Sequence, residues 1–357
     1  MAATEAKAAG FGKTLTTRVN ERLTEDDMRW GRRRLHRKAV VVVGWYALSY
    51  VALLLAGSWF TGVLACLSMA LAMVSVGFNI QHDANHNAFF DTGGRRRLTR
   101  ANRIAGLSLN AIGGSSKRWI DGHVHLHHSA PNVVGTDYDI VVPFARMAPQ
   151  QESRPYHAYQ HVYVWFLYGF TALGIVVGDI VNAVQEAFAG GRKGKAPSAR
   201  DQAGMAVSKG LFLAVMVGVP LLFHPWWIVL LGSLFVMFVA GFLLGIVFQL
   251  AHVVEETEFC EADNRPDVRW HEWQVRSSVD FCHGSGPADR ALTWFIGGLN
   301  YQTEHHLLPN LPHTLYPVVA PVVEDTCAEY DIPYHVQPSL RAAVRSHHRH
   351  LRNMGRQ

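Results

Sequence analysis

Charged side chains are scarce in this chain of 357 residues, and two long stretches lack them altogether. Asp, Glu, Lys and Arg make up 17% of the residues, against about 25% in an ordinary soluble domain, while 49% are hydrophobic. Residues 39–81 and residues 210–251 contain none of these four types, and His224 is the only titratable group in the second stretch apart from Cys and Tyr. This composition excludes disordered, collagen-like and coiled-coil proteins.

Cysteine is sparse too, and the basic excess is small. The four cysteines contain no CxxC pair, which indicates neither a structural zinc site nor a disulfide framework. The net charge is +5, and the basic residues flank apolar stretches instead of lying beside aromatic residues that stack on bases. This pattern excludes a nucleic-acid partner and favours a membrane surface.

Each uncharged stretch is long enough to cross a bilayer twice, because one spanning helix needs about 20 apolar residues. Glycine in residues 57–62 and His224-Pro225-Trp226-Trp227 mark a turn in each stretch. The sequence therefore predicts an all-α membrane protein with four spans, at about 39–58, 61–81, 210–223 and 226–250, arranged as two hairpins. Residues 155–178 are also uncharged, but basic clusters on both sides favour an amphipathic or re-entrant helix at the cytoplasmic interface.

Lys and Arg gather outside the spans, and both hairpin turns lack them. The positive-inside rule places both termini and the long middle loop in the cytoplasm of a multi-pass protein, which we expect in a bacterial cell membrane. We divide the chain into a basic N-terminal segment (1–38), a membrane domain (39–340) and a basic C-terminal tail (341–357) that we expect to fray. Residues 190–198 are typical of a flexible cytoplasmic linker.

Histidine is abundant, with 20 residues, and many of them cluster where the spans meet the cytoplasm. The clusters are HDANH at 82–86, HVHLHH at 123–128 and QTEHH at 302–306, and His252 directly follows the last apolar stretch. Pairs at i and i+4 lie on one face of a helix. Grouping so many imidazoles is costly unless they bind something, and imidazole suits Fe, Cu, Zn and Ni. Eight or nine ligands are too many for one ion and suit two.

These three boxes, in this order, resemble the HxxxH, HxxxHH and QxxHH boxes of the integral-membrane fatty acid desaturase family. The third box and its surroundings, GLNYQTEHHLLP, are similar to the front-end subgroup of that family. The resemblance covers roughly residues 35 to 340. It implies a cytoplasmic helical cap that carries a histidine-rich di-iron site, with molecular oxygen as co-substrate. The ligands that it implies are His82, His86, His123, His127, His128, His252, His305 and His306, with Gln302 as a direct, water-mediated or supporting ligand.

The resemblance implies removal of two hydrogens from an acyl chain, presented as a CoA ester, a carrier-protein thioester or a lipid. The protein would place the chain in a narrow apolar tunnel beneath the metal site. The sequence has no HPGG haem motif, and residues 1–38 are too short for a cytochrome b5 domain. We therefore expect the electrons to come from a separate donor: a ferredoxin or flavin-dependent reductase, or a cytochrome b5-type protein.

Some alternatives stay open. A related di-iron hydroxylase or acetylenase would use the same ligands. A metal transporter or membrane haem protein would place its histidines inside the spans, whereas the uncharged stretches contain only His224, at a turn. Carboxylates often orient metal-bound imidazoles. The candidates near the clusters, each of which could equally be an exposed loop charge, are Asp83, Asp137, Asp139, Glu255, Glu256 and Glu304.

Overall fold

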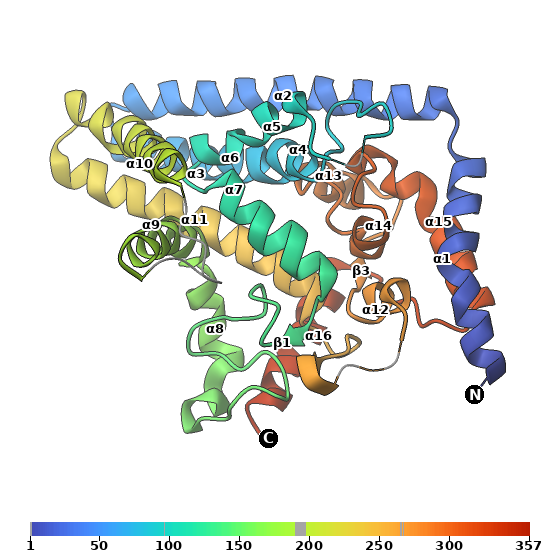
Figure 1. Ribbon diagram of the computed structural model, residues 1–357. Coiled ribbons are helices and arrows are strands. Elements are labelled where there is room, and N and C mark those ends of the chain that lie inside the picture. The colour runs from blue at the N-terminus through green and yellow to red at the C-terminus, as the bar shows by residue number, and fades with distance from the viewer. Residues whose placement is uncertain (1, 96, 190–197, 265, 267) are drawn as a thin grey trace.

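The protein is predominantly helical, and the described residues include four short strands of two residues each (Figure 1). The computed structural model describes all residues except 1, 96, 190–197, 265 and 267. The linker predicted at 190–198 therefore lies, except for Ser198, outside the described residues.

Within the described residues, four helical segments are long and apolar enough to cross a membrane, which confirms the predicted fold class. The first is α2 (Glu25–Leu54), and the fourth is α11 (Trp226–His252). The second runs through α3 (Trp59–Val76), the π-helical turn η1 (Gly77–Gln81) and α4 (His82–Asn85). The third runs through α10 (Ala199–Leu213), η6 (Ala214–Gly218) and η7 (Pro220–Leu222). Helix α2 begins well before residue 39, so residues 25–38 continue the first span as one helix.

The turns of both hairpins lie where the sequence predicts them. Ser58 caps the N-terminus of α3 in a capping box with Thr61, directly after α2 ends. The rings of Trp59 and Trp227 lie 5.8 Å apart and join the two turns, at the left of Figure 1. Leu48 and Leu222 leave 71% and 80% of their surface uncovered. Such exposure on the spans is what a lipid-facing surface requires.

A bent helical pair packs against the fourth span. It consists of α8 (Gln160–Tyr168), preceded by η4 (Pro155–Tyr159), and α9 (Thr171–Ala189). The helix direction bends by 78° between the two arms, as in a re-entrant element or a broken span. Both α8 and α9 contact α11. The interfacial or re-entrant placement of this pair stays a prediction.

The remaining elements form a cap at the end of the spans opposite the turns (Figure 1). Two short parallel strand pairs join its loops: β1 (Val133–Val134) with β2 (Cys260–Glu261), and β3 (Asp280–Phe281) with β4 (Val336–Gln337). The helical elements of the cap are α1 (Ala2–Arg22), α5 (Arg100–Gly106), α6 (Ser108–Ala111), α7 (Ser116–Trp119), η2 (Ile120–Leu126), η3 (His127–Ser129), η8 (Ala262–Asn264), α12 (Trp270–Arg276), α13 (Pro287–Phe295), α14 (Gln302–Leu307), η9 (His313–Leu315), α15 (Tyr316–Glu329) and α16 (Leu340–Met354).

The C-terminal tail does not fray, and that expectation is wrong. Residues 340–354 form the helix α16, in which His347 and Leu351 are fully buried. The Nδ1 atom of His347 lies 2.5 Å from the carbonyl oxygen of Val253. The high charge of the tail concealed this docking, because only Leu351 and Met354 on its buried face are large apolar side chains and the others are small or polar.

Candidate metal centre

Eight histidines from four parts of the chain converge where the spans meet the cap. His82 begins α4, and His86 follows that helix. The second histidine cluster lies on η2 and η3, His252 ends α11, and the third cluster lies on α14. All eight predicted histidine ligands are buried: His82, His86, His123, His127, His128, His252, His305 and His306.

The first group consists of His82, His86, His123 and His305. One ring nitrogen of each lies within 4.8 Å of a ring nitrogen of every other member. Among the described residues, the buried Nε2 atoms of all four have no hydrogen-bond partner. Buried polar atoms are normally paired. Four unpaired nitrogens at one place therefore fit the coordination of a metal ion.

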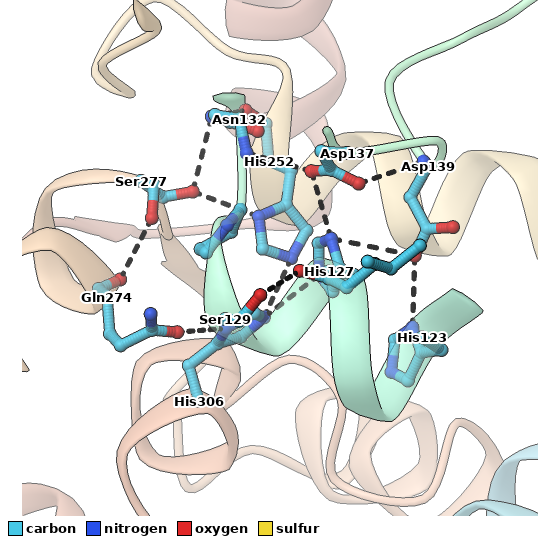
Figure 2. Close-up of polar contacts among 12 residues, drawn as sticks. His123, His127, Ser129, Asn132, Asp137, Asp139, His252, Gln274, Ser277 and His306 are labelled. Atoms are coloured by element: carbon cyan, nitrogen blue, oxygen red, sulfur yellow. Dashed lines mark hydrogen bonds and ion pairs between the residues drawn. The ribbon is translucent and has the colours of Figure 1, made fainter. Parts of the chain in front are cut away.

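The second group consists of His127, His252 and His306. The Nε2 atom of His306 lies 3.1 Å from that of His252 and 3.3 Å from that of His127. A metal about 2.1 Å from each imidazole nitrogen holds neighbouring nitrogens roughly 3 to 4 Å apart. The three nitrogens therefore already have the spacing of a coordination site (Figure 2).

His128 and Gln302 border these groups. The ring of His128 lies 4.4 Å from that of His306 and 4.6 Å from that of His86, between the two groups. Neither of its ring nitrogens has a hydrogen-bond partner among the described residues. The amide nitrogen of Gln302 lies 2.9 Å from the Nε2 atom of His252. Gln302 is thus at the second group, although this orientation presents its nitrogen and not its oxygen to the site.

Acceptors at the Nδ1 atoms decide which ring nitrogen faces the centre (Figure 2). The Nδ1 atom of His127 lies 3.0 Å from Asp137, and that of His123 lies 3.0 Å from Asp139. In the second group, the Nδ1 atom of His252 donates to the carbonyl of Ser277 at 2.9 Å. The Nδ1 atom of His306 donates to Gln274 at 2.7 Å, and that of His305 lies 3.1 Å from the Tyr316 hydroxyl. An N–H at Nδ1 leaves the lone pair of a neutral ring on Nε2.

The same contacts separate the pKa values of two stacked rings. Burial lowers the pKa of His127, but Asp137 and Asp139 outweigh it and raise the value to about 9. Burial dominates at His123 and lowers its pKa to about 4, despite the hydrogen bond to Asp139. Burial also keeps the pKa of His128 well below the usual range. The metal-free centre therefore holds a proton on His127 at neutral pH, while His123 and His128 are neutral donors.

Carboxylates near the clusters have three different roles. Asp137 and Asp139 orient ligands, as the sequence allowed. Asp83 accepts a hydrogen bond from the ring of His313 at 2.9 Å, and its other oxygen lies 4.0 Å from the Nδ1 atom of His82. Glu304 points away from the histidines toward Asp280 and Tyr334, and burial beside Asp280 raises the pKa of Glu304 well above its usual range.

The other two candidate carboxylates serve the C-terminal helix. Glu255 pairs with Arg349 at 2.6 Å, and Glu256 accepts from Ser346 at 2.6 Å. They hold α16 and do not orient a ligand.

Sequence reasoning missed several supporting residues. Asn132 donates its side-chain amide to the carbonyl of His252 at 2.9 Å, and its backbone N–H to Asp137 at 2.8 Å. Its φ of +57° suits Asn better than most residues. Gln274 and Tyr316 also lie far in sequence from the rings that they contact. A local pattern could have flagged only Asn132, because it lies close to the second box.

Two π-helical turns orient the histidine ligands. The turn η1 directly precedes His82, and η2 contains His123 and ends before His127. A π-helical turn inserts a residue into a helix and rotates the residues after it, and such turns often mark functional sites. As a result, the rings of His123 and His127 stack at 4.9 Å. The ring of Trp119 stacks on that of His123 at 4.4 Å and so packs against this histidine. His125 lies outside both groups.

The predicted acyl tunnel has a small counterpart. An apolar cleft between α3, α6, α9 and α11 has a volume of about 40 Å³, and its lining includes Met73, Ile112, Ala172, Ala240 and Leu244. That volume suits about one water-sized group and not an acyl chain. The tunnel therefore stays a prediction.

The donor set fits two transition-metal ions. Neutral imidazole is a good ligand for Fe, Zn, Cu and Ni, and the two groups offer four and three histidines, with His128 between them. Acceptors at the Nδ1 atoms supply the outer support that metal-bound histidines generally need.

Comparison with known proteins agrees with this centre. The profile described as fatty acid desaturase matches residues 57–338. The chain is 32% identical over 355 residues to the sn-1 linoleoyl-lipid 6-desaturase of Arthrospira platensis, covering 98% of this chain and 93% of that protein. It is 31% identical over 354 residues to the protein of the same name from Synechocystis sp., covering 97% and 96%. An acyl-lipid (8-3)-desaturase of Physcomitrium patens is 34% identical over 337 residues, covering 89% and 66%. The chain therefore belongs to the fatty acid desaturase family.

Proposed function

We propose that this desaturase holds two iron ions in the histidine centre and introduces a double bond into an acyl chain carried by a membrane lipid. The observation that carries the proposal is the convergence of the two histidine groups. The Nε2 atoms of the first group have no hydrogen-bond partner among the described residues, and in the second group the Nε2 atom of His306 lies 3.1 Å from that of His252 and 3.3 Å from that of His127. The names of the relatives, which are acyl-lipid desaturases, support a lipid-borne substrate.

The ligand assignment follows the two groups. His82, His86, His123 and His305 would hold one iron, and His127, His252 and His306 the other. His128 borders both, and Gln302 stands beside the second. When bound, the irons would supply the oxidising power, drawn from dioxygen, that side chains lack.

The chain's own residues prepare the centre for that chemistry. Asp137, Gln274 and the carbonyl of Ser277 hold Nδ1 protons, so that the Nε2 lone pairs face inward. The Asp137 carboxylate also keeps His127 basic until a metal replaces its proton. Burial of all eight rings excludes bulk water from the place where a C–H bond must react.

We propose that the centre faces the cytoplasm of a bacterial cell membrane, together with both termini. The density of Arg near the start of α2 and on α16, and its absence from the hairpin turns, supports this orientation. A reporter fused after Gln357 should then lie on the cytoplasmic side, and an external reporter would contradict it.

Product analysis tests the function directly. The purified chain should contain about two irons. A host that expresses it with an electron donor should accumulate lipids in which an acyl chain has lost two hydrogens. Lipids that instead gain one oxygen atom would identify a hydroxylase, and products confined to CoA or carrier-protein thioesters would overturn the lipid substrate. The variant His127→Ala, expressed at the same level, is the inactive control.

A further inference from the structure

Helix α16 and the turn that follows it carry five arginines on one exposed face. Their spacing of three or four residues places them along one side of an α-helix and its following turn, and all five are exposed: Arg341, Arg345, Arg349, Arg352 and Arg356. We name this set the arginine stripe. Among the described residues, Arg349 alone forms an ion pair, with Glu255. Like charges three or four residues apart destabilise a helix, so the stripe costs stability unless an external anion meets it.

The opposite face of α16 contacts residues that closely follow the ligand His252 in sequence. The Nδ1 atom of His347 donates to the carbonyl of Val253, the residue that follows the ligand His252. The Tyr168 hydroxyl lies 2.7 Å from the other ring nitrogen of His347. The backbone N–H of Glu255 donates to the Ser346 hydroxyl at 3.1 Å. The stripe is therefore separated from the backbone of a metal ligand by one helix diameter, which is about 10 Å.

The stripe does not have the form of a membrane anchor. An interfacial helix keeps an apolar face for the lipid beneath its basic face. Here that face is covered by protein, since His347, Leu351 and Met354 are buried. In α16 and the residues after it, all of which are described, the only exposed large hydrophobic residue is Leu340, at the start of the helix. The arginines at the start of α2 differ, because Arg33, Arg34 and Arg37 directly precede the exposed Val40 and Val41.

We propose that the arginine stripe is the docking surface for an acidic one-electron carrier protein of the iron–sulfur or flavin class. This inference rests on the proposed function, in which dioxygen accepts four electrons and four protons to become two waters. The acyl chain supplies two electrons and two protons as its two C–H bonds break and the double bond forms. The carrier supplies the other two electrons, one at a time, and solvent supplies the other two protons. Charge complementarity would speed and orient the encounter.

Matched triple variants test the proposal in the full-length, iron-loaded protein. Arg341→Gln, Arg345→Gln and Arg352→Gln together remove three of the five charges of the stripe and keep Arg349, which pairs with Glu255. The control variant, Arg33→Gln, Arg34→Gln and Arg37→Gln, removes the same charge from α2. Both are placed in nanodiscs of zwitterionic phosphatidylcholine and, separately, in nanodiscs that also contain an anionic phospholipid. Each is supplied either with an acidic [2Fe–2S] ferredoxin and its reductase or with dithionite and methyl viologen.

We expect the stripe variant to raise the KM for ferredoxin by about tenfold or more and to weaken its dependence on salt. Its product formation with the small reductant should stay within about twofold of the parent, as should both measurements for the control variant. An unchanged KM for ferredoxin would overturn the proposal. Equal losses with both reductants would show a structural role instead, and an effect seen only in anionic nanodiscs would assign the stripe to lipid headgroups.

Failure of the proposed function would give a different result from failure of the docking proposal. In that case the parent makes no alkene even with iron and the small reductant. Ferredoxin binding, measured by calorimetry on the parent and the stripe variant, would still test whether the stripe binds the carrier. Equal affinity of the two would contradict it.

Discussion

The two histidine groups are supported unequally. In the second group, each ring gives its Nδ1 proton to a nearby acceptor: His127 to Asp137, His252 to a backbone carbonyl and His306 to Gln274. In the first group, His123 has Asp139 and His305 has the weaker acceptor Tyr316. His82 and His86 rely on the packing of α4 and Trp119. One half of the centre is thus oriented by hydrogen bonds, and the other largely by helix geometry.

This difference indicates how the centre assembles. Acceptors that hold a ring in its ligating tautomer reduce the reorganisation needed when a metal binds. The second group should therefore be rigid and sensitive to its polar neighbours. The first should depend on the continuity of the span that carries it, through η1 into α4.

The largest effect should come from removing a ligand of each group. His306→Ala and His86→Ala should each lower iron from about two per chain to about one, because each breaks one group. Each should reduce desaturation by more than about 100-fold. Iron analysis and lipid profiling at matched expression measure both effects. Substitution of His125, which lies outside both groups, by Ala is the control. Full iron content in either ligand variant would contradict the assignment.

Next in size is the loss of a hydrogen-bonded acceptor from the second group. Asp137→Asn keeps the shape of the side chain but removes the charge that holds the His127 proton. It should weaken metal binding by about 10- to 100-fold. Competition with a chelator, followed by iron analysis, measures the loss. The variant Glu256→Gln, whose carboxylate bonds only to α16 in the described contacts, should bind iron as the parent does. A parent-like Asp137→Asn would show that packing alone orients His127.

The pH dependence of metal loading should differ between the groups. Because the pKa of His127 is raised to about 9, a metal must displace its proton. Affinity at the second group should therefore rise by about tenfold for each pH unit up to about 9 and then level off. In the first group, His123 should add no pH dependence above about pH 5, because burial lowers its pKa to about 4. Titration of Co2+ into His86→Ala, which keeps the second group, and His306→Ala, which keeps the first, separates them. Identical slopes would contradict the assignment.

The smallest effect on metal affinity should come from removing the weakest acceptor. Tyr316→Phe removes the hydroxyl near the Nδ1 atom of His305 and leaves the ring of residue 316 in place. Because a neutral hydroxyl accepts less strongly than a carboxylate, metal affinity should fall by about tenfold or less. The chelator assay used for Asp137→Asn gives the comparison. A larger loss than in Asp137→Asn would reverse the inferred order of support.

Much of the centre could be predicted from the order of residues. Spacings of four residues place histidines on one helix face, and the uncharged stretches place two of the four clusters, residues 82–86 and His252, at the ends of spans. That reasoning found all eight histidines that the structure brings together. It could not find Gln274, Tyr316 or Asn132, because their roles arise from contacts across the fold. It also misjudged residues 341–357, where small and polar side chains are buried against Val253 and Met147.

Local physics accounts for the helices, the two hairpins and the histidine-rich character of the chain, since apolar length and turn residues act over short distances. Which ring joins which group, which nitrogen faces inward and which arginines lie together outside depend on contacts across the whole chain. Those choices belong to the tertiary structure. A hydrogen bond such as that from His306 to Gln274 forms only after packing has brought distant segments within its short range.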